Sequence, residues 1–162
     1  MLNKTVEEFL NRQIEREEYS SNLYLSMAVW AETSGFSGIA EWFYAQADEE
    51  RTHMLKFVKY VNDRGGKAII GAVKQPPADF ETINETFVSV LKHEQFISQS
   101  INEVVGICIA EKDFTTQNWL QFFVNEQIEE EASVQLILDK LKLIGDTNLY
   151  MFDRDIMTLR TE

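Results

Sequence analysis

Six side chains that are able to ligate a metal ion interrupt four apolar helical faces of this 162-residue chain. They are Glu17, Glu50, His53, Glu94, Gln127 and Glu130. A carboxylate is costly to bury without a partner, so four apolar faces that each carry one require a shared explanation. A pair of metal ions at the centre of a four-helix bundle supplies that explanation.

The pair Glu50 and His53 is the most compact of these signals. A helix places residues three apart on one face, so this spacing points a carboxylate and an imidazole in the same direction. On a solvated helix such a pair is usually a surface glutamate beside a surface histidine, but this face also carries Phe43, Met54 and Phe57. The alternative is a buried Glu50–His53 pair whose hydrogen-bonding groups are satisfied without a metal ion. The presence of the other carboxylates argues against that alternative.

The donor set indicates which metal to expect. Four glutamates supply four negative charges, which balance two divalent ions or two Fe³⁺ ions bridged by an oxide. A single histidine among hard oxygen donors suits iron or manganese better than a metal that prefers thiolates. The expected ligand sets are Glu17, Glu50 and His53 for one ion, and Glu50, Glu94 and Glu130, with Gln127 close by, for the other. Because the second set has no histidine, we expect it to hold its ion more loosely.

Two further side chains are expected beside the ions. Tyr24 lies two turns beyond Glu17 on the same helical face, where a core tyrosine can bond one of the carboxylates. Gln127 lies one turn before Glu130. We therefore assign Tyr24 and Gln127 to the catalytic surroundings of the predicted centre.

Apolar residues recur at helical spacing along most of the chain, and turn residues separate the runs. The predicted helices cover approximately residues 5–33, 37–64, 82–111 and 114–143. Capping boxes, Thr5 with Glu8 and Thr82 with Glu85, predict two of the helix starts. After Gly145 the sequence predicts a short amphipathic helix, with its apolar residues in register at Leu149, Phe152, Ile156 and Leu159.

The lengths of the connections predict the topology. Short turns near residues 34–36 and 112–114 make two antiparallel hairpins. The stretch that contains Pro76 and Pro77 has about 15 residues, which can span about 50 Å and therefore the roughly 42 Å of a 28-residue helix. The second and third helices can then run parallel. The predicted fold is an all-α, four-helix bundle with one long crossover connection and a short C-terminal fifth helix, forming a single domain over residues 1–162.

The numbering of the candidate ligands offers an internal test of this topology. In an antiparallel hairpin, two residues at equal depth have a mean position that coincides with the turn. Glu17 and Glu50 average to a point between residues 33 and 34, and Glu94 and Glu130 average to residue 112. Both means fall on or beside a predicted turn. Each pair of carboxylates is therefore expected to lie level within its own hairpin.

Composition narrows the function class. The net charge of −12 disfavours nucleic acid and anionic membranes as partners and favours cations. No apolar run reaches the length of a membrane span, and the start of the chain does not look like a signal peptide. The single cysteine, Cys108, lies among apolar residues and fits a buried thiol in a reducing cytoplasm. We expect a cytoplasmic protein.

The chain resembles the bacterial non-haem ferritins over nearly its whole length. The segments that carry the resemblance are residues 11–24, 48–53, 94, 118–123 and 127–131. The family implies a homo-oligomeric hollow shell of 24 subunits that stores iron. It also implies ferroxidase activity, in which O₂ or H₂O₂ oxidises Fe²⁺ at two iron sites within each subunit before ferric mineral collects inside.

The same resemblance implies a third iron site beside the dinuclear centre. Its residues would be Glu49, Glu126 and Glu129, together with Glu130. An acidic, solvated helix face explains these glutamates equally well from sequence alone. The resemblance also places the short fifth helix at a fourfold axis of the shell.

Relatives with the same bundle make different predictions. Bacterioferritins carry a second Glu-x-x-His pair where this chain has Gln127 to Glu130, and a haem-ligating methionine where it has Arg51. No haem is therefore expected. A carboxylate-bridged di-iron oxidase or peroxidase without storage is the alternative function.

Overall fold

The computed structural model describes residues 1–160, without the side chain of Asp146. These residues form α1 (Lys4–Thr33), α2 (Ser37–Asp63), α3 (Ile83–Ala110), α4 (Phe114–Ile144), a 3₁₀ turn (Gly145–Thr147), α5 (Leu149–Asp155) and a final 3₁₀ turn (Ile156–Leu159). No strand occurs within this described part of the chain. The all-α prediction is confirmed, and the helix bounds agree with the sequence prediction to within one residue at most ends.

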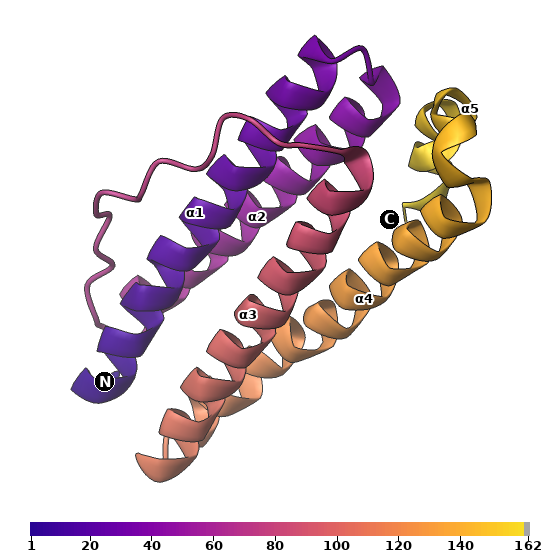
Figure 1. Cartoon of the computed structure of the whole chain (residues 1–162). Coiled ribbons are helices and arrows are strands. Elements are labelled where there is room, and N and C mark those ends of the chain that lie inside the picture. Colours follow the sequence, from indigo (N-terminus) through magenta and orange to yellow (C-terminus); the bar gives the residue numbers. More distant parts are fainter. Residues whose placement is uncertain (161–162) are drawn as a thin grey trace.

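Figure 1 shows the predicted topology. α1 and α2 form one antiparallel hairpin, and α3 and α4 form the other. The long connection runs along the outside of α1 and returns the chain to the end at which α2 began, so α2 and α3 are parallel. Within residues 1–160, no helix is long and apolar enough to cross a membrane.

The start of α1 differs from the capping box predicted at Thr5. Asn3 is the N-cap, and its side chain accepts hydrogen bonds from the backbone N–H of Thr5 at 2.8 Å and of Val6 at 3.4 Å. Asparagine is at least as good a cap as threonine, so the helix starts one residue earlier. Glu8 then points away from the cap and pairs with Arg12. The second predicted cap, Thr82, is confirmed.

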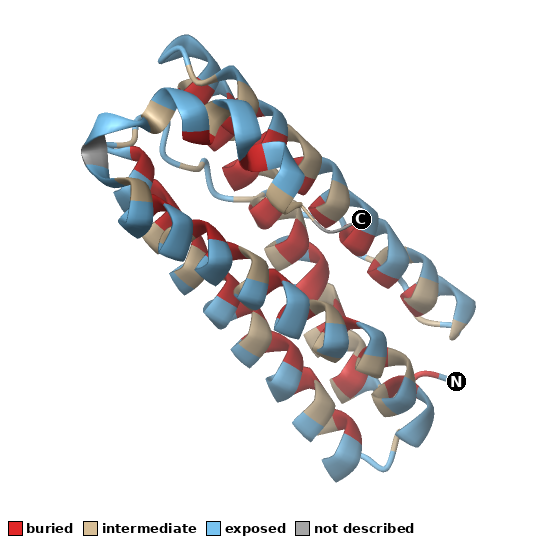
Figure 2. Ribbon diagram, turned by 90° about the vertical axis from the view of Figure 1, so that its right-hand side faces the viewer, coloured by how far each residue is buried: buried red, intermediate tan, exposed pale blue. Residues whose placement is uncertain are grey.

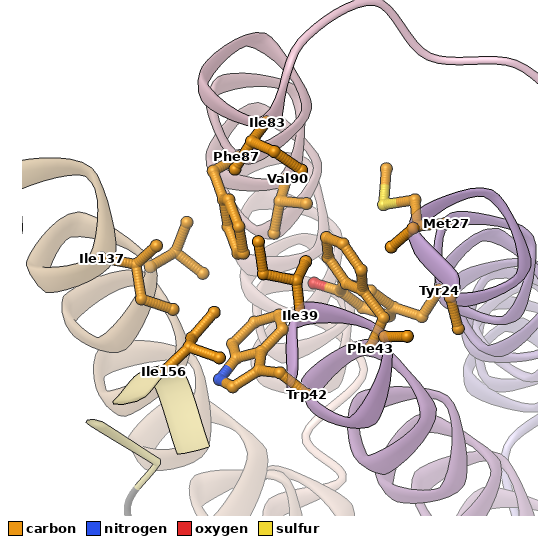
Figure 3. Close-up of a cluster of buried hydrophobic side chains, with 14 of the residues drawn as sticks. Tyr24, Met27, Ile39, Trp42, Phe43, Ile83, Phe87, Val90, Ile137 and Ile156 are labelled. Atoms are coloured by element: carbon orange, nitrogen blue, oxygen red, sulfur yellow. The ribbon is translucent and has the colours of Figure 1, made fainter. Parts of the chain in front are cut away.

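The core consists of two apolar clusters, one toward each end of the bundle, with a polar layer between them. Buried positions recur on the inward faces of the helices (Figure 2). The upper cluster, nearer α5, is rich in aromatic rings; Figure 3 shows Trp42, Phe43 and Phe87 packed together. The lower cluster, nearer the N-terminus, includes Phe57 and the buried Cys108. Burial of apolar surface in these clusters stabilises the bundle. The layer between them holds polar and ionisable side chains.

The C-terminal segment keeps the predicted apolar register but shortens the predicted helix. Phe152 and Ile156 are buried against the bundle. α5 ends at Asp155, and a 3₁₀ turn continues from there. The segment packs on α2 where Gly38 has no side chain, and the backbone N–H of Ile39 donates to Oδ1 of Asp153 at 2.9 Å. A Cβ at Gly38 would lie 1.8 Å from the Asp153 carbonyl oxygen, so this position requires glycine.

Gly38→Ala is expected to push α5 off α2 and to destabilise the protein by about 1–3 kcal/mol, the usual cost of overpacking. Gly106→Ala is the matched control, because Gly106 lies near the C-terminal end of α3 and nothing lies within 4 Å of the added Cβ. That change should stabilise the helix by about 0.5–1 kcal/mol. Denaturant unfolding of both variants checks the prediction, and equal stability of the two would contradict it.

Candidate metal centre

The polar layer contains all six residues that the sequence singled out as ligands. Glu17 comes from α1, Glu50 and His53 from α2, Glu94 from α3, and Gln127 and Glu130 from α4. All six are buried, and even the most accessible of them, Glu130, is only 7% exposed. The layer separates the two apolar clusters. The four helices therefore deliver one carboxylate each to the same depth of the bundle, as the hairpin arithmetic predicts.

Three of these residues form a compact ligand group. One ligand atom each from Glu17, Glu50 and His53 lies within 4.8 Å of the others, and all three side chains are buried. Nδ1 of His53 lies 3.6 Å from Oε2 of Glu50. That Glu50 oxygen is buried and has no hydrogen-bond partner among residues 1–160. Because a buried acceptor without a partner is costly, the oxygen fits a cation placed between the three side chains.

Burial and mutual repulsion govern the charge of the layer. Burial, followed by the charge of Glu50, raises the pKa of Glu17 well above its ordinary value. Burial, followed by the charge of Glu94, does the same to the pKa of Glu50. The pKa of Glu130 rises to about 8 for the same two reasons, burial and the charge of Glu94. Each carboxyl thus resists ionisation until positive charge enters the layer.

Hydrogen bonds orient the other two carboxylates. Glu94 accepts from the Tyr24 hydroxyl and from Nε2 of Gln127, the latter at 3.0 Å. Glu130 accepts from Nε2 of Gln46 at 3.0 Å. Neither Glu94 nor Glu130 belongs to the compact group of three. These donors orient the oxygens of Glu94 and Glu130 within the layer.

A second group of ligand atoms lies on the outer side of His53. Oxygens of Glu49 and Glu126 and a nitrogen of His53 lie within 4.8 Å of one another. Nε2 of His53 lies 3.7 Å from Oε2 of Glu126. A neutral imidazole has one lone pair, so a ring that ligates through Nδ1 presents an N–H at Nε2 and cannot also ligate in the outer group. Glu49 and Glu126 must then bind an ion without His53. Glu129, also predicted there, is exposed and in neither group.

Three residues in or beside this layer were not predicted from the sequence: Gln13 and Gln46 contact its carboxylates, and Arg160 contacts Gln46. Gln13 donates to Oε1 of Glu17 at 2.5 Å, and Gln46 donates to Glu130. Each glutamine precedes a predicted ligand, Glu17 or Glu50, by four residues on a helical face, a signal that could have found it. Arg160 donates to Gln46 and to Glu49 from the end of the chain. The apolar register of residues 149–159 ends directly before Arg160 and does not predict which groups its side chain contacts.

Comparison with known proteins gives a consistent result. The profile of the family described as "Ferritin-like domain" matches residues 7–144. The chain is 40% identical over 164 residues to a probable bacterial non-heme ferritin-like protein of Haemophilus influenzae, covering 100% of this chain and 99% of that protein. It is 40% identical over 161 residues to a bacterial non-heme ferritin of Campylobacter jejuni, covering 98% and 96%. A crystal structure of an open-pore ferritin from Archaeoglobus fulgidus superposes with a TM-score of 0.94 at 40% identity, covering 99% of this chain and 98% of that one.

The raised pKa of Glu130 predicts how the stability of the metal-free protein depends on pH. The folded state holds this proton up to about pH 8, whereas the ordinary value is 4.5. The stability that this proton provides is complete below about pH 4.5. It is lost progressively as the pH rises to and through about 8, and the total loss in the free energy of unfolding is at most about 5 kcal/mol if Glu130 titrates alone. Glu130→Gln should lose less stability between pH 6 and pH 9. Denaturant titrations of the metal-free proteins measure this, and parallel pH profiles would contradict it.

Proposed function

The chain belongs to the ferritin family, and from that premise we propose that it oxidises Fe²⁺ within each subunit and stores the product as ferric mineral inside a hollow shell. Membership of the family, among relatives named bacterial non-heme ferritins, supports iron storage. The observation that carries the finer proposal is the layer itself. It holds four buried glutamates from four helices, and Oε2 of Glu50 has no hydrogen-bond partner among residues 1–160.

Iron enters this proposal as the substrate. Glu17, Glu50 and His53 bind one Fe²⁺, and Glu50 bridges to a second Fe²⁺ held by Glu94 and Glu130. Each ion gives up one electron, and the two electrons with two protons convert O₂ to H₂O₂, or H₂O₂ with the same two electrons and two protons to two water molecules. Because the carboxyls have raised pKa values, protons leave them as the cations bind, so the layer itself is a source of those protons.

The surrounding side chains hold the second ion loosely. Tyr24 and Gln127 both donate to Glu94, which orients that carboxylate and also draws electron density away from it. Among residues 1–160, no group of ligand atoms joins a histidine with Glu94 or Glu130. An ion bound there is held less tightly than the one at His53, and it moves on after oxidation. Glu49 and Glu126, which share the outer ligand group, form the third site through which iron passes, together with Glu130 and the exposed Glu129.

The oligomeric part of the proposal rests on the relatives. The Archaeoglobus fulgidus protein that superposes on this chain is described as an open-pore ferritin. We propose that this chain likewise assembles with copies of itself into a shell, with 24 subunits and with α5 near a fourfold axis, in the cytoplasm. Exposed apolar residues on α4, among them Phe114, Ile128 and Leu143, are available for contacts between subunits.

An oxidase that acts on an organic substrate is the alternative, and the space around the layer disfavours it. A groove of about 150 Å³ between α3 and α4 is lined by Gln127 and Glu131 and touches the layer. Sites for organic ligands usually have about 300–1,000 Å³. The larger hollows, of about 760 Å³ and about 540 Å³, are lined by none of the six layer residues.

The experiment that separates storage from an oxidase is the amount of iron retained per particle. We expect a large assembly that, after aerobic loading with Fe²⁺ and size separation, carries many more iron atoms than subunits. About two irons per subunit with no further uptake would contradict storage while keeping the dinuclear centre.

Glu50→Ala is expected to lower the initial rate of Fe²⁺ oxidation by at least about tenfold to a hundredfold, because it removes the ligand shared by both ions. The shell should remain assembled, since the apolar clusters are untouched. Glu41→Ala is the matched control, an exposed glutamate on the same helix, and should leave the rate unchanged. Absorbance of ferric product after mixing measures both, and an unaltered rate in the Glu50 variant would overturn the assignment.

A further inference from the structure

The C-terminal segment ends beside the outer carboxylates. Arg160 follows the last 3₁₀ turn, and its guanidinium reaches back to α2. Nη2 donates to Oε2 of Glu49 at 2.6 Å, and Nη1 donates to Oε1 of Gln46. The Arg160 side chain is only 20% exposed and that of Glu49 is 33% exposed. The contact is therefore partly withdrawn from solvent, which makes a charge-assisted pair stronger than one on the open surface.

The same guanidinium is connected to the inner layer through one intermediate. Gln46 accepts from Arg160 with its amide oxygen, which leaves the amide nitrogen to donate to Oε2 of Glu130 at 3.0 Å. Glu49 belongs to the outer ligand group with Glu126. One arginine thus contacts a carboxylate of the outer group directly and a carboxylate of the inner layer through Gln46.

We propose that Arg160 is the resident counter-ion of Glu49 and competes with a third metal ion for the outer carboxylates. A carboxylate oxygen that accepts from a guanidinium is engaged by a positive charge, so a cation must displace that charge before it can use the same oxygen. The nearby +1 charge also repels a divalent ion at Glu126. Arg160 therefore weakens the third site, so that iron which arrives there is released again rather than held.

This inference rests on the proposed iron site, but the two can fail separately. The competing explanation is that Arg160 only anchors the tail to α2. Replacement would then loosen the C-terminal segment without changing metal affinity. The two explanations differ in a binding constant, which can be measured without turnover.

The test is an equilibrium titration of metal-free assembled protein with Mn²⁺, which ligates to the same hard oxygen donors as Fe²⁺. Arg160→Met keeps the length and apolar volume of the side chain but removes its charge. We expect it to tighten the third, weakest Mn²⁺ site roughly tenfold and to leave the two tighter sites unchanged. Arg154→Met is the matched control, since Arg154 pairs with its neighbour Asp155. It should reproduce the unmodified isotherm.

A double-mutant cycle with Glu49→Gln identifies the carboxylate concerned. Once Glu49 is removed, Arg160→Met should have a smaller effect on the third site, because only the repulsion of an ion at Glu126 is left to relieve. Arg160→Lys should give an intermediate affinity, because lysine keeps the charge but not the two-pronged geometry. An unchanged third affinity in Arg160→Met, with two tight sites intact, would overturn this inference alone. Failure of the unmodified protein to bind Mn²⁺ at the two inner sites would overturn the proposed function and this inference with it.

Discussion

The structure depends on keeping four carboxyl groups together in a layer that excludes water. Burial, and after it the repulsion between like charges that little solvent screens, raises the pKa values of Glu17, Glu50 and Glu130. The repulsion must be offset elsewhere. Apolar clusters above and below the layer pack tightly enough to do this, with Phe43 and Phe87 stacked at 5.2 Å between centroids in one of them. The bundle is thus stable on either side of a layer that is electrostatically strained.

The depth of each candidate ligand within the bundle was predictable because helical geometry is regular. The mean positions of Glu17 with Glu50 and of Glu94 with Glu130 predicted the depth of the layer, and the length of the single long connection allowed α2 and α3 to be parallel. Such inferences succeed because a helix has a fixed rise per residue and a buried face has a fixed period. The ligand groups could be anticipated to within one helical turn for the same reason.

Contacts that depend on the chemistry of individual side chains were not predictable to the same degree. Asn3 caps α1 in place of Thr5. Both residue types are adequate caps and lie two residues apart, so the sequence pattern left the exact start of the helix open. Glu94 and Glu130 lie outside the compact ligand group because they take hydrogen bonds from Tyr24 and Gln46, partners on other helices. Arg160 pairs with Glu49, which lies 111 positions earlier in the sequence, and no helical periodicity relates residues so far apart.

The lone cysteine acquires significance from its surroundings. Cys108 is buried in the lower apolar cluster, and burial raises the pKa of its thiol to about 11. Peroxide attacks the thiolate rather than the thiol, so at neutral pH this sulfur offers almost no reactive form. The oxidation proposed above would generate oxidants at every turnover, and these would convert an exposed, ionised cysteine to sulfinic acid. Under that proposal, burial of Cys108 would protect the thiol over many cycles of iron loading.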